Sequence, residues 1–213
     1  PSQALQDAGY HVIYSGQKTY NGVALLSRDP PSQVGTDLSS LDDPQRRIIA
    51  ATVGDLRIYN VYVPNGQAVG TDKFEYKLRW LATLRDFLED ELSRHENLVV
   101  LGDFNIAPAD EDVYDAEKWG DAILCSPKER EALGRLLDLG LTDVFRKFEQ
   151  PEKTFSWWDY RAAGFRRNAG LRIDLILTSS TMTQRCHASY VDKEPRAWER
   201  PSDHAPVVAE FET

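Results

Sequence analysis

The chain has 213 residues, a net charge of -9, a pI near 5.0 and 41% hydrophobic residues, which allows one domain with a substantial core. No stretch approaches the roughly 18 consecutive apolar residues of a membrane span, so we expect no membrane partner. Two cysteines, Cys125 and Cys186, are too few for a disulfide framework or a zinc knuckle. We predict two buried thiols in a reducing cytoplasm.

The acidic balance argues at first against a nucleic acid partner, because non-specific affinity for DNA comes from Lys and Arg side chains that neutralise phosphates. The local arrangement weakens this objection, since four arginines fall within one short segment: Arg161, Arg166, Arg167 and Arg172. A bound divalent cation would add positive charge at a reaction centre. Global charge therefore does not decide the partner.

The first part of the chain is predicted to form short strands separated by turns. Segments rich in Val, Ile and Tyr lie at 10–14, 23–27, 48–53 and 56–63, and Gly54 and Asp55 are typical of a hairpin turn between the last two. Over 72–95, apolar residues recur every three or four positions. This spacing predicts an amphipathic helix that covers one face of a sheet.

The second part combines a buried strand with a well-marked helix. Residues 98–101 form a continuous apolar run, which predicts a strand buried on both faces that ends at Gly102. Ser126, Pro127 and Glu129 are typical of an N-cap, a first-turn proline and a capping box, and Gly140 closes the helix. Further strands are predicted at 171–178, 188–192 and 205–211. We therefore predict one α/β domain of stacked sheets flanked by helices.

Asp103 and Asn105 follow the buried strand directly. At a strand end, alternate side chains share a face, so we expect both to project into a cleft while Phe104 points back to the core. A carboxylate and an amide placed in this way suit a metal-activated water and a phosphate oxygen. An ordinary polar turn fits the same residues equally well.

A carboxylate and a histidine form a second candidate site. Asp174 lies in an otherwise apolar strand, where burial without a partner is costly. We propose His204 as that partner, because a carboxylate orients an imidazole and favours its charged form. Asp203, beside His204, is placed to reach a metal. Tyr62, near the end of the 56–63 strand, offers a hydroxyl to a phosphate, although a strand tyrosine usually serves packing.

Taken together, these segments resemble the exonuclease III family of abasic-site endonucleases, within the endonuclease/exonuclease/phosphatase superfamily. Seven segments match in order and span almost the whole chain: 21–28, 45–49, 60–66, 102–108, 155–161, 172–174 and 202–206. The resemblance implies a four-layered α/β sandwich, in which two packed mixed sheets are flanked by helices. It also implies magnesium or manganese as cofactor, and duplex DNA with abasic sites or 3′ ends as substrate.

The resemblance further implies roles for the matching residues. Asp103 orients or deprotonates the attacking water, Asn105 and Tyr62 hold the phosphate, and His204, oriented by Asp174, stabilises the transition state. Asp103, Asn105 and Asp203 are the expected metal ligands. The sequence leaves open whether the base is Asp103 or the His204 pair, because both are plausible proton acceptors beside a metal.

Tryptophan and arginine residues are expected to select the substrate. Paired tryptophans usually fill a core, and we assign Trp158 to it. The resemblance suggests that Trp157 lines a pocket for a base-less sugar, with Leu171 on another wall, which selects by excluding sugars that bear a base. Arg161, Arg166 and Arg167 are expected to lie against the DNA backbone, with a solvated loop as the competing interpretation.

Relative to the resembled family, residues 1–213 are expected to be a single domain that lacks an opening strand-helix-strand with an Asn and a metal-binding Glu. Two alternatives are therefore kept: a non-catalytic DNA-binding fragment, and a related phosphatase that acts on a lipid or inositol phosphate. The arginine-rich segment after Trp157 favours DNA. A cytoplasmic, nucleoid-associated monomer is expected.

Overall fold

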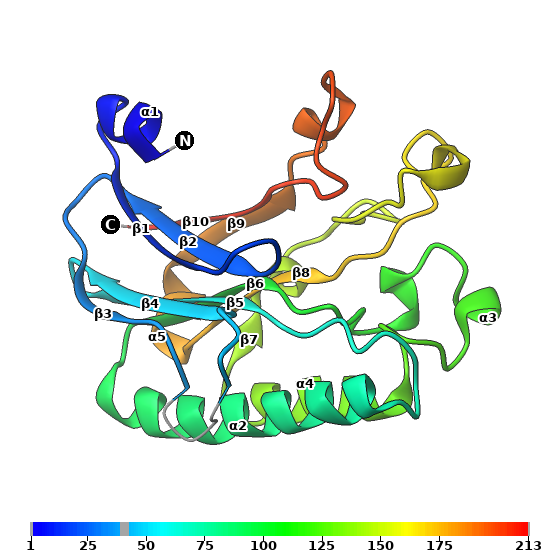
Figure 1. The fold of residues 1–213 in the computed structure, drawn as a ribbon, viewed down its shortest axis with the longest axis horizontal. Helices are drawn as coiled ribbons and strands as arrows, with labels where there is room; N and C mark the ends of the chain where they lie inside the picture. Colours follow the sequence, from blue (N-terminus) through cyan, green and yellow to red (C-terminus); the bar gives the residue numbers. More distant parts are fainter. Residues whose placement is uncertain (1, 39–42, 213) are drawn as a thin grey trace.

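A six-stranded mixed sheet organises the computed structural model, which describes residues 2–38 and 43–212 (Figure 1). In spatial order its strands are β3 (Ser32–Gly35), β4 (Ile48–Val53), β5 (Leu56–Tyr62), β6 (Leu98–Asp103), β8 (Asp174–Thr178) and β7 (Thr142–Asp143). Strands β5 and β6 are parallel, whereas the other neighbours are antiparallel. The parallel pair requires a crossover, and a long helix between β5 and β6 supplies it.

That helix, α2 (Asp72–Arg94), covers one face of the sheet together with α4 (Pro127–Leu137) (Figure 1). The α2 side chains Leu81, Leu84 and Leu88 are buried against the sheet. Burying each contributes about 1.5–3 kcal/mol. The capping box of Ser126 and Glu129 is present as predicted, and Gly140 follows α4 with a φ of +92°.

Two antiparallel pairs cover the opposite face: β1 (His11–Gly16) with β2 (Gly22–Ser27), and β9 (Cys186–Val191) with β10 (Val207–Phe211). Leu25 of β2 packs with Ile49, and Ala209 of β10 packs with Ile176. The smaller helices are α1 (Ser2–Asp7), α3 (Ala116–Trp119) and α5 (Ser180–Arg185). The predicted α/β architecture, in which packed sheets are flanked by helices, is confirmed.

The structure also describes the two cysteines and the apolar character of the helices. Cys125 and Cys186 are buried thiols, as expected. Across residues 2–38 and 43–212, no helix has the length and apolar character needed to cross a membrane.

The predicted strand ends need correction at two points that matter for function. Gly102 does not end β6, which continues through Asp103. Strand β8 begins at Asp174 rather than at Leu171, because the backbone N–H and C=O of Leu171 bond to Trp157 instead of to β6. The other predicted strand ends lie within two residues of the observed ones, whereas β3 and β7 were not predicted.

Gly102 permits a close approach of β6 to β5. Its φ is +134°, and a Cβ atom at this position would overlap the carbonyl oxygen of Val61. We expect Gly102→Ala to lower the free energy of unfolding by about 2–4 kcal/mol, through backbone strain and overpacking. Urea denaturation measures the change. Gly140→Ala is the matched control, since its φ is +92° with no heavy atom within 4 Å, and we expect about 1 kcal/mol. An equal loss of unfolding free energy in the two variants would show that β5 moves at little cost to accommodate a Cβ atom at position 102.

Candidate active site

Three predicted site residues lie in one row across neighbouring strands. Tyr62 on β5 is paired in register with Asp103 on β6, and Asp103 is paired with Asp174 on β8. Because directly paired residues point to the same face of a sheet, the hydroxyl and the two carboxylates share that face. The strand ends therefore bring together residues that are far apart in the sequence.

His204 joins this row through Asp174, as predicted. Its Nδ1 lies 2.8 Å from Oδ2 and 3.1 Å from Oδ1 of Asp174. Ser156 fixes the backbone at this point, because its Oγ accepts hydrogen bonds from the N–H groups of Ile173 and Asp174. Asp174 is the first residue of β8 and its side chain is 19% exposed, so it opens the strand rather than lying inside it.

The electrostatics of this pair favour a charged imidazole. Burial opposes the charge, but the hydrogen bond and charge of Asp174, together with the charges of Asp103 and Asp203, raise the pKa of His204 to about 9. A group held in this form suits the stabilisation of negative charge that develops on a phosphate.

Asp103 and Asn105 lie together, although not through strand alternation. Asn105 has a φ of +51°, and its N–H donates to Oδ1 of Asp103 at 2.8 Å, which forms a local turn. Its Nδ2 donates to Oδ2 of Asp103 at 2.9 Å and to the carbonyl of Val63 at 3.0 Å. Phe104 is fully buried, as expected. Burial and the neighbouring Asp174 raise the pKa of Asp103 to about 7.

Trp157 and Asp203 pair with each other beside His204. The indole Nε1 of Trp157 donates to Oδ2 of Asp203 at 3.0 Å, and the Trp157 backbone forms a bridge to His204. Trp157 is partly exposed, whereas Trp158 is buried in the core as predicted. Leu171 is also fully buried, so of the two proposed pocket walls only Trp157 exposes surface in this structure.

The arginine-rich segment divides into two parts. Arg161, Arg166 and Arg167 are exposed, and among the described residues none of them pairs with a carboxylate. Arg172 is buried and bonds to Asp112 at 2.6 Å and Asp143 at 2.7 Å. Counting Arg172 toward a DNA surface was wrong, because a buried and paired guanidinium presents no charge to a phosphate.

Three residues that support the site received no role from the sequence, although Arg47 and Asn65 lie in the matching segments 45–49 and 60–66. Arg47 donates to the carbonyl of Tyr62 at 3.1 Å, and its guanidinium lies 4.8 Å from the centre of the Tyr62 ring. Asn65 donates from Nδ2 to Oδ1 of Asn105 at 3.0 Å. Lys77 is buried on α2 below the Asn105 turn. A lysine between Phe74 and Leu81 on an apolar helix face was the available signal.

The oxygen donors of the site fit a hard divalent cation. Asp103 and Asp203 offer carboxylates, which magnesium and manganese prefer. The raised pKa of Asp103 shows that burial and Asp174 disfavour its negative charge, which a cation would compensate. Asn105, the third predicted ligand, directs Oδ1 toward Asn65. Within residues 2–38 and 43–212, no group of three His, Cys, Asp or Glu side chains is arranged to hold a metal.

Comparison with known proteins shows the family of the chain. Residues 1–204 match the model of the Endonuclease/Exonuclease/phosphatase family. Exodeoxyribonuclease III of Haemophilus influenzae is 39% identical over 224 residues, an alignment that covers 99% of this chain and 84% of that protein. The match extends over most of the chain, so the protein belongs to the Endonuclease/Exonuclease/phosphatase family.

Solved structures agree in fold and sequence. The 3′-5′ exonuclease NExo from Neisseria meningitidis is 55% identical with a TM-score of 0.98, covering 100% of this chain and 84% of that one. An AP endonuclease from Archaeoglobus fulgidus is 36% identical with a TM-score of 0.94, covering 100% and 83%. Another Neisseria structure, of the 3′ phosphatase NExo bound to product DNA hairpin, is 54% identical with a TM-score of 0.98, covering 100% and 83%. These relatives identify the chain as a hydrolytic nuclease of DNA repair.

Proposed function

We propose that the protein hydrolyses phosphate esters of duplex DNA at 3′ ends and on the 5′ side of abasic sites, with magnesium or manganese as cofactor. The observation that carries this proposal is the row of Tyr62, Asp103 and Asp174, with His204 bonded to Asp174. The named activities of the Neisseria and Archaeoglobus relatives support the two kinds of substrate.

In the proposed reaction, water attacks phosphorus, the P–O bond to the leaving oxygen breaks, and the leaving oxygen takes up a proton from solvent. Asp103 orients the water and accepts its proton, while the His204 imidazolium stabilises the charge on the phosphate. The Nδ2 group of Asn105 already donates hydrogen bonds to Asp103 and to the carbonyl of Val63. Tyr62 is therefore the first residue proposed to hold the phosphate. A divalent cation held by Asp103 and Asp203 would supply Lewis acidity at the phosphate.

DNA reaches the site, in this proposal, along the exposed arginines 161, 166 and 167. These arginines follow Trp157 in the chain, and the Trp157 backbone forms a bridge to His204. Phosphate contacts of this kind position a duplex without reading its sequence. This local charge allows an acidic protein of net charge -9 to bind a polyanion.

Trp157 is expected to set the preference for abasic sites. We expect Trp157→Ala to reduce the ratio of kcat/KM for abasic over intact duplex by about 10-fold, the effect of losing one pocket wall. The same change removes the hydrogen bond to Asp203, so Trp157→Phe is the matched control that keeps the ring without the donor. We expect Trp157→Phe to retain the preference. Equal loss of activity on every substrate in both variants would assign Trp157 to a structural role.

The test of the proposed function uses the full-length protein and two labelled duplexes. One duplex carries a single abasic-site analogue and the other a 3′ phosphate at a nick. We expect magnesium-dependent incision of the first, release of phosphate from the second, and loss of both with EDTA. Activity on only one duplex would restrict the proposal to that substrate. Activity on neither would favour a DNA-binding role or a phosphatase for small phosphate esters.

A further inference from the structure

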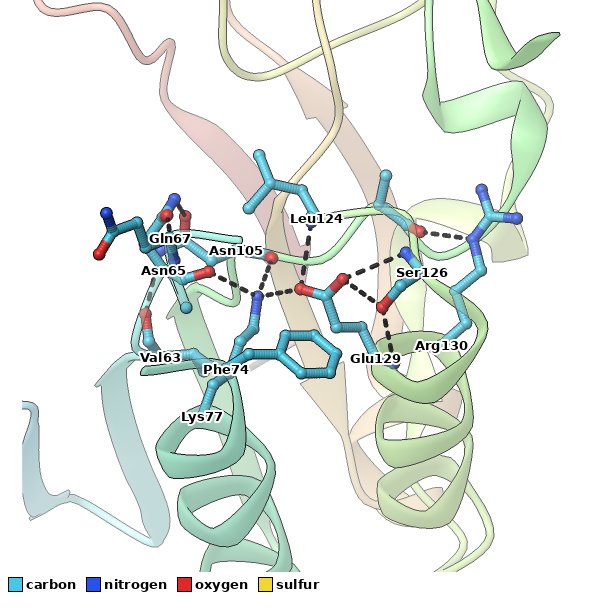
Figure 2. Close-up of polar contacts among 12 residues, drawn as sticks. Val63, Asn65, Gln67, Phe74, Lys77, Asn105, Leu124, Ser126, Glu129 and Arg130 are labelled. Atoms are coloured by element: carbon cyan, nitrogen blue, oxygen red, sulfur yellow. Dashed lines mark hydrogen bonds and ion pairs between the residues drawn. The ribbon is translucent and has the colours of Figure 1, made fainter. Parts of the chain in front are cut away.

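A buried ion pair lies directly beneath the Asp103–Asn105 turn (Figure 2). Lys77 of α2 and Glu129 of α4 form this pair, and both side chains are fully buried. Removing two charges from water is costly unless each is paired and fully hydrogen-bonded. The proposed chemistry at Tyr62, Asp103 and His204 makes no direct use of either residue, so their burial calls for another explanation.

The hydrogen bonds of the pair are complete. The Lys77 ammonium has three N–H donors and meets three acceptors: the carbonyl of Asn105 at 2.6 Å, the carbonyl of Asn65 at 3.2 Å, and Oε1 of Glu129. Glu129 in turn accepts from the N–H of Leu124 at 3.1 Å, and from the N–H and hydroxyl of Ser126 at 3.1 and 2.6 Å. A neutral amine would leave one of the three acceptors unmatched.

The two carbonyls that Lys77 holds belong to the two segments that carry the site. Asn65 follows β5 and Tyr62, whereas Asn105 follows β6 and Asp103. Figure 2 shows the Lys77 ammonium between both carbonyls and the Glu129 carboxylate. The side chains of Asn65 and Asn105 are bonded to each other at 3.0 Å above it. One ammonium therefore ties together the turns that follow the two parallel strands.

The contact with Asn105 has a direct consequence for Asp103. Asn105 has a left-handed backbone, with a φ of +51°, a conformation that asparagine adopts more readily than most residues. Lys77 fixes the carbonyl side of Asn105, and Asp103 accepts from its N–H at 2.8 Å. The orientation of the Asp103 carboxylate thus depends on a turn that Lys77 anchors.

We propose that Lys77, held by Glu129, is a positioning residue for catalysis, which sets the Asn105 turn and through it the direction of Asp103. This inference rests on the proposed function, because it assigns Asp103 to the reaction. Lys77 touches neither the substrate nor the reacting atoms. Displacing a catalytic group by about 1 Å is enough to reduce turnover by roughly 100-fold.

Three variants of the full-length protein, with one control, separate positioning from stability. Lys77→Met removes the ammonium at similar length, and Lys77→Arg returns a cation. Because Lys77→Met leaves Glu129 as an unpaired buried charge, the double variant Lys77→Met with Glu129→Gln removes both charges and protects folding. Glu91→Gln is the matched control: Glu91 is a buried carboxylate at the far end of α2 that pairs with Arg57 at 3.8 Å.

Steady-state cleavage of the abasic duplex and thermal unfolding are measured for each variant. We expect kcat to fall roughly 100-fold in the double variant, with KM unchanged within about 3-fold and a near-normal Tm. Lys77→Arg is expected to recover at least a tenth of wild-type kcat. Glu91→Gln is expected to lower Tm while it keeps kcat.

The outcomes distinguish a failure of the positioning role of Lys77 from a failure of the proposed function. A folded double variant with wild-type kcat overturns the positioning role, even though the wild type cleaves DNA. The positioning role is also overturned if Glu91→Gln loses kcat in the same proportion to its loss of Tm as the double variant does. Both changes would then act through stability alone. An inactive wild type contradicts the proposed function itself.

Discussion

Asp103→Asn is expected to lower kcat for cleavage of the abasic duplex by roughly 10³-fold while DNA affinity stays within about 3-fold. Asparagine keeps the shape of Asp103 and can still accept from the Asn105 N–H, which lies at 2.8 Å. It cannot accept a proton from water, and it carries no negative charge toward a metal. The loss is thus expected in the chemical step rather than in folding or binding.

Single-turnover cleavage and fluorescence anisotropy with a labelled duplex check this prediction. Asp192→Asn is the matched control, because Asp192 accepts from the N–H of Glu194 at 3.0 Å in the same kind of local turn. We expect this control to cleave at the wild-type rate. Turnover within about 10-fold of wild type in Asp103→Asn would remove Asp103 from the role of base.

The second large effect is expected at the His204–Asp174 pair. We expect His204→Ala to lower kcat by about 10³-fold, because it removes the cation that faces the phosphate. Asp174→Asn is expected to cost about 10²-fold, since the imidazole remains but loses the partner at 2.8 Å that raises its pKa. The double variant is expected to be no slower than His204→Ala alone, because Asp174 acts through His204.

A double-mutant cycle in kcat measures this coupling. His95→Ala is the matched control, since His95 also lies beside a carboxylate, 3.6 Å from Glu91, but directly after the C-terminal end of α2. We expect that control to keep wild-type kcat. Fully additive losses in the cycle would show that Asp174 serves the reaction independently of His204, for example through Asp103, with which it is paired in register.

The two longest helices, α2 and α4, and the buried strand β6 were predictable from the sequence because their signals are local, whereas α1, α3 and α5 were not predicted. The spacing of Leu81, Leu84 and Leu88 marks the buried face of α2, and the Ser126–Glu129 capping box marks the start of α4. The partnership of Asp174 and His204 was also predictable, because an ionisable residue in an apolar segment needs a partner. The prediction was confirmed at 2.8 Å.

The strand ends near the site were harder to predict. Gly102 is a typical strand terminator, yet here its positive φ lets β6 continue beside β5. Leu171 has the composition of a strand residue, but its backbone bonds to Trp157. In both cases the competing partner lies far away in the sequence, and local propensity carries no information about it.

By itself, the sequence determined the class of fold and the kinds of residue that carry the chemistry, because hydrophobic periodicity and residue type are properties of short segments. Only the tertiary structure decided which of them meet. It aligned Tyr62 with Asp103 through strand register, buried Arg172 against two carboxylates, and placed the Lys77 ammonium beneath Asn105. Strand register, the pairing of buried charges and the anchoring of turns all depend on contacts between distant segments.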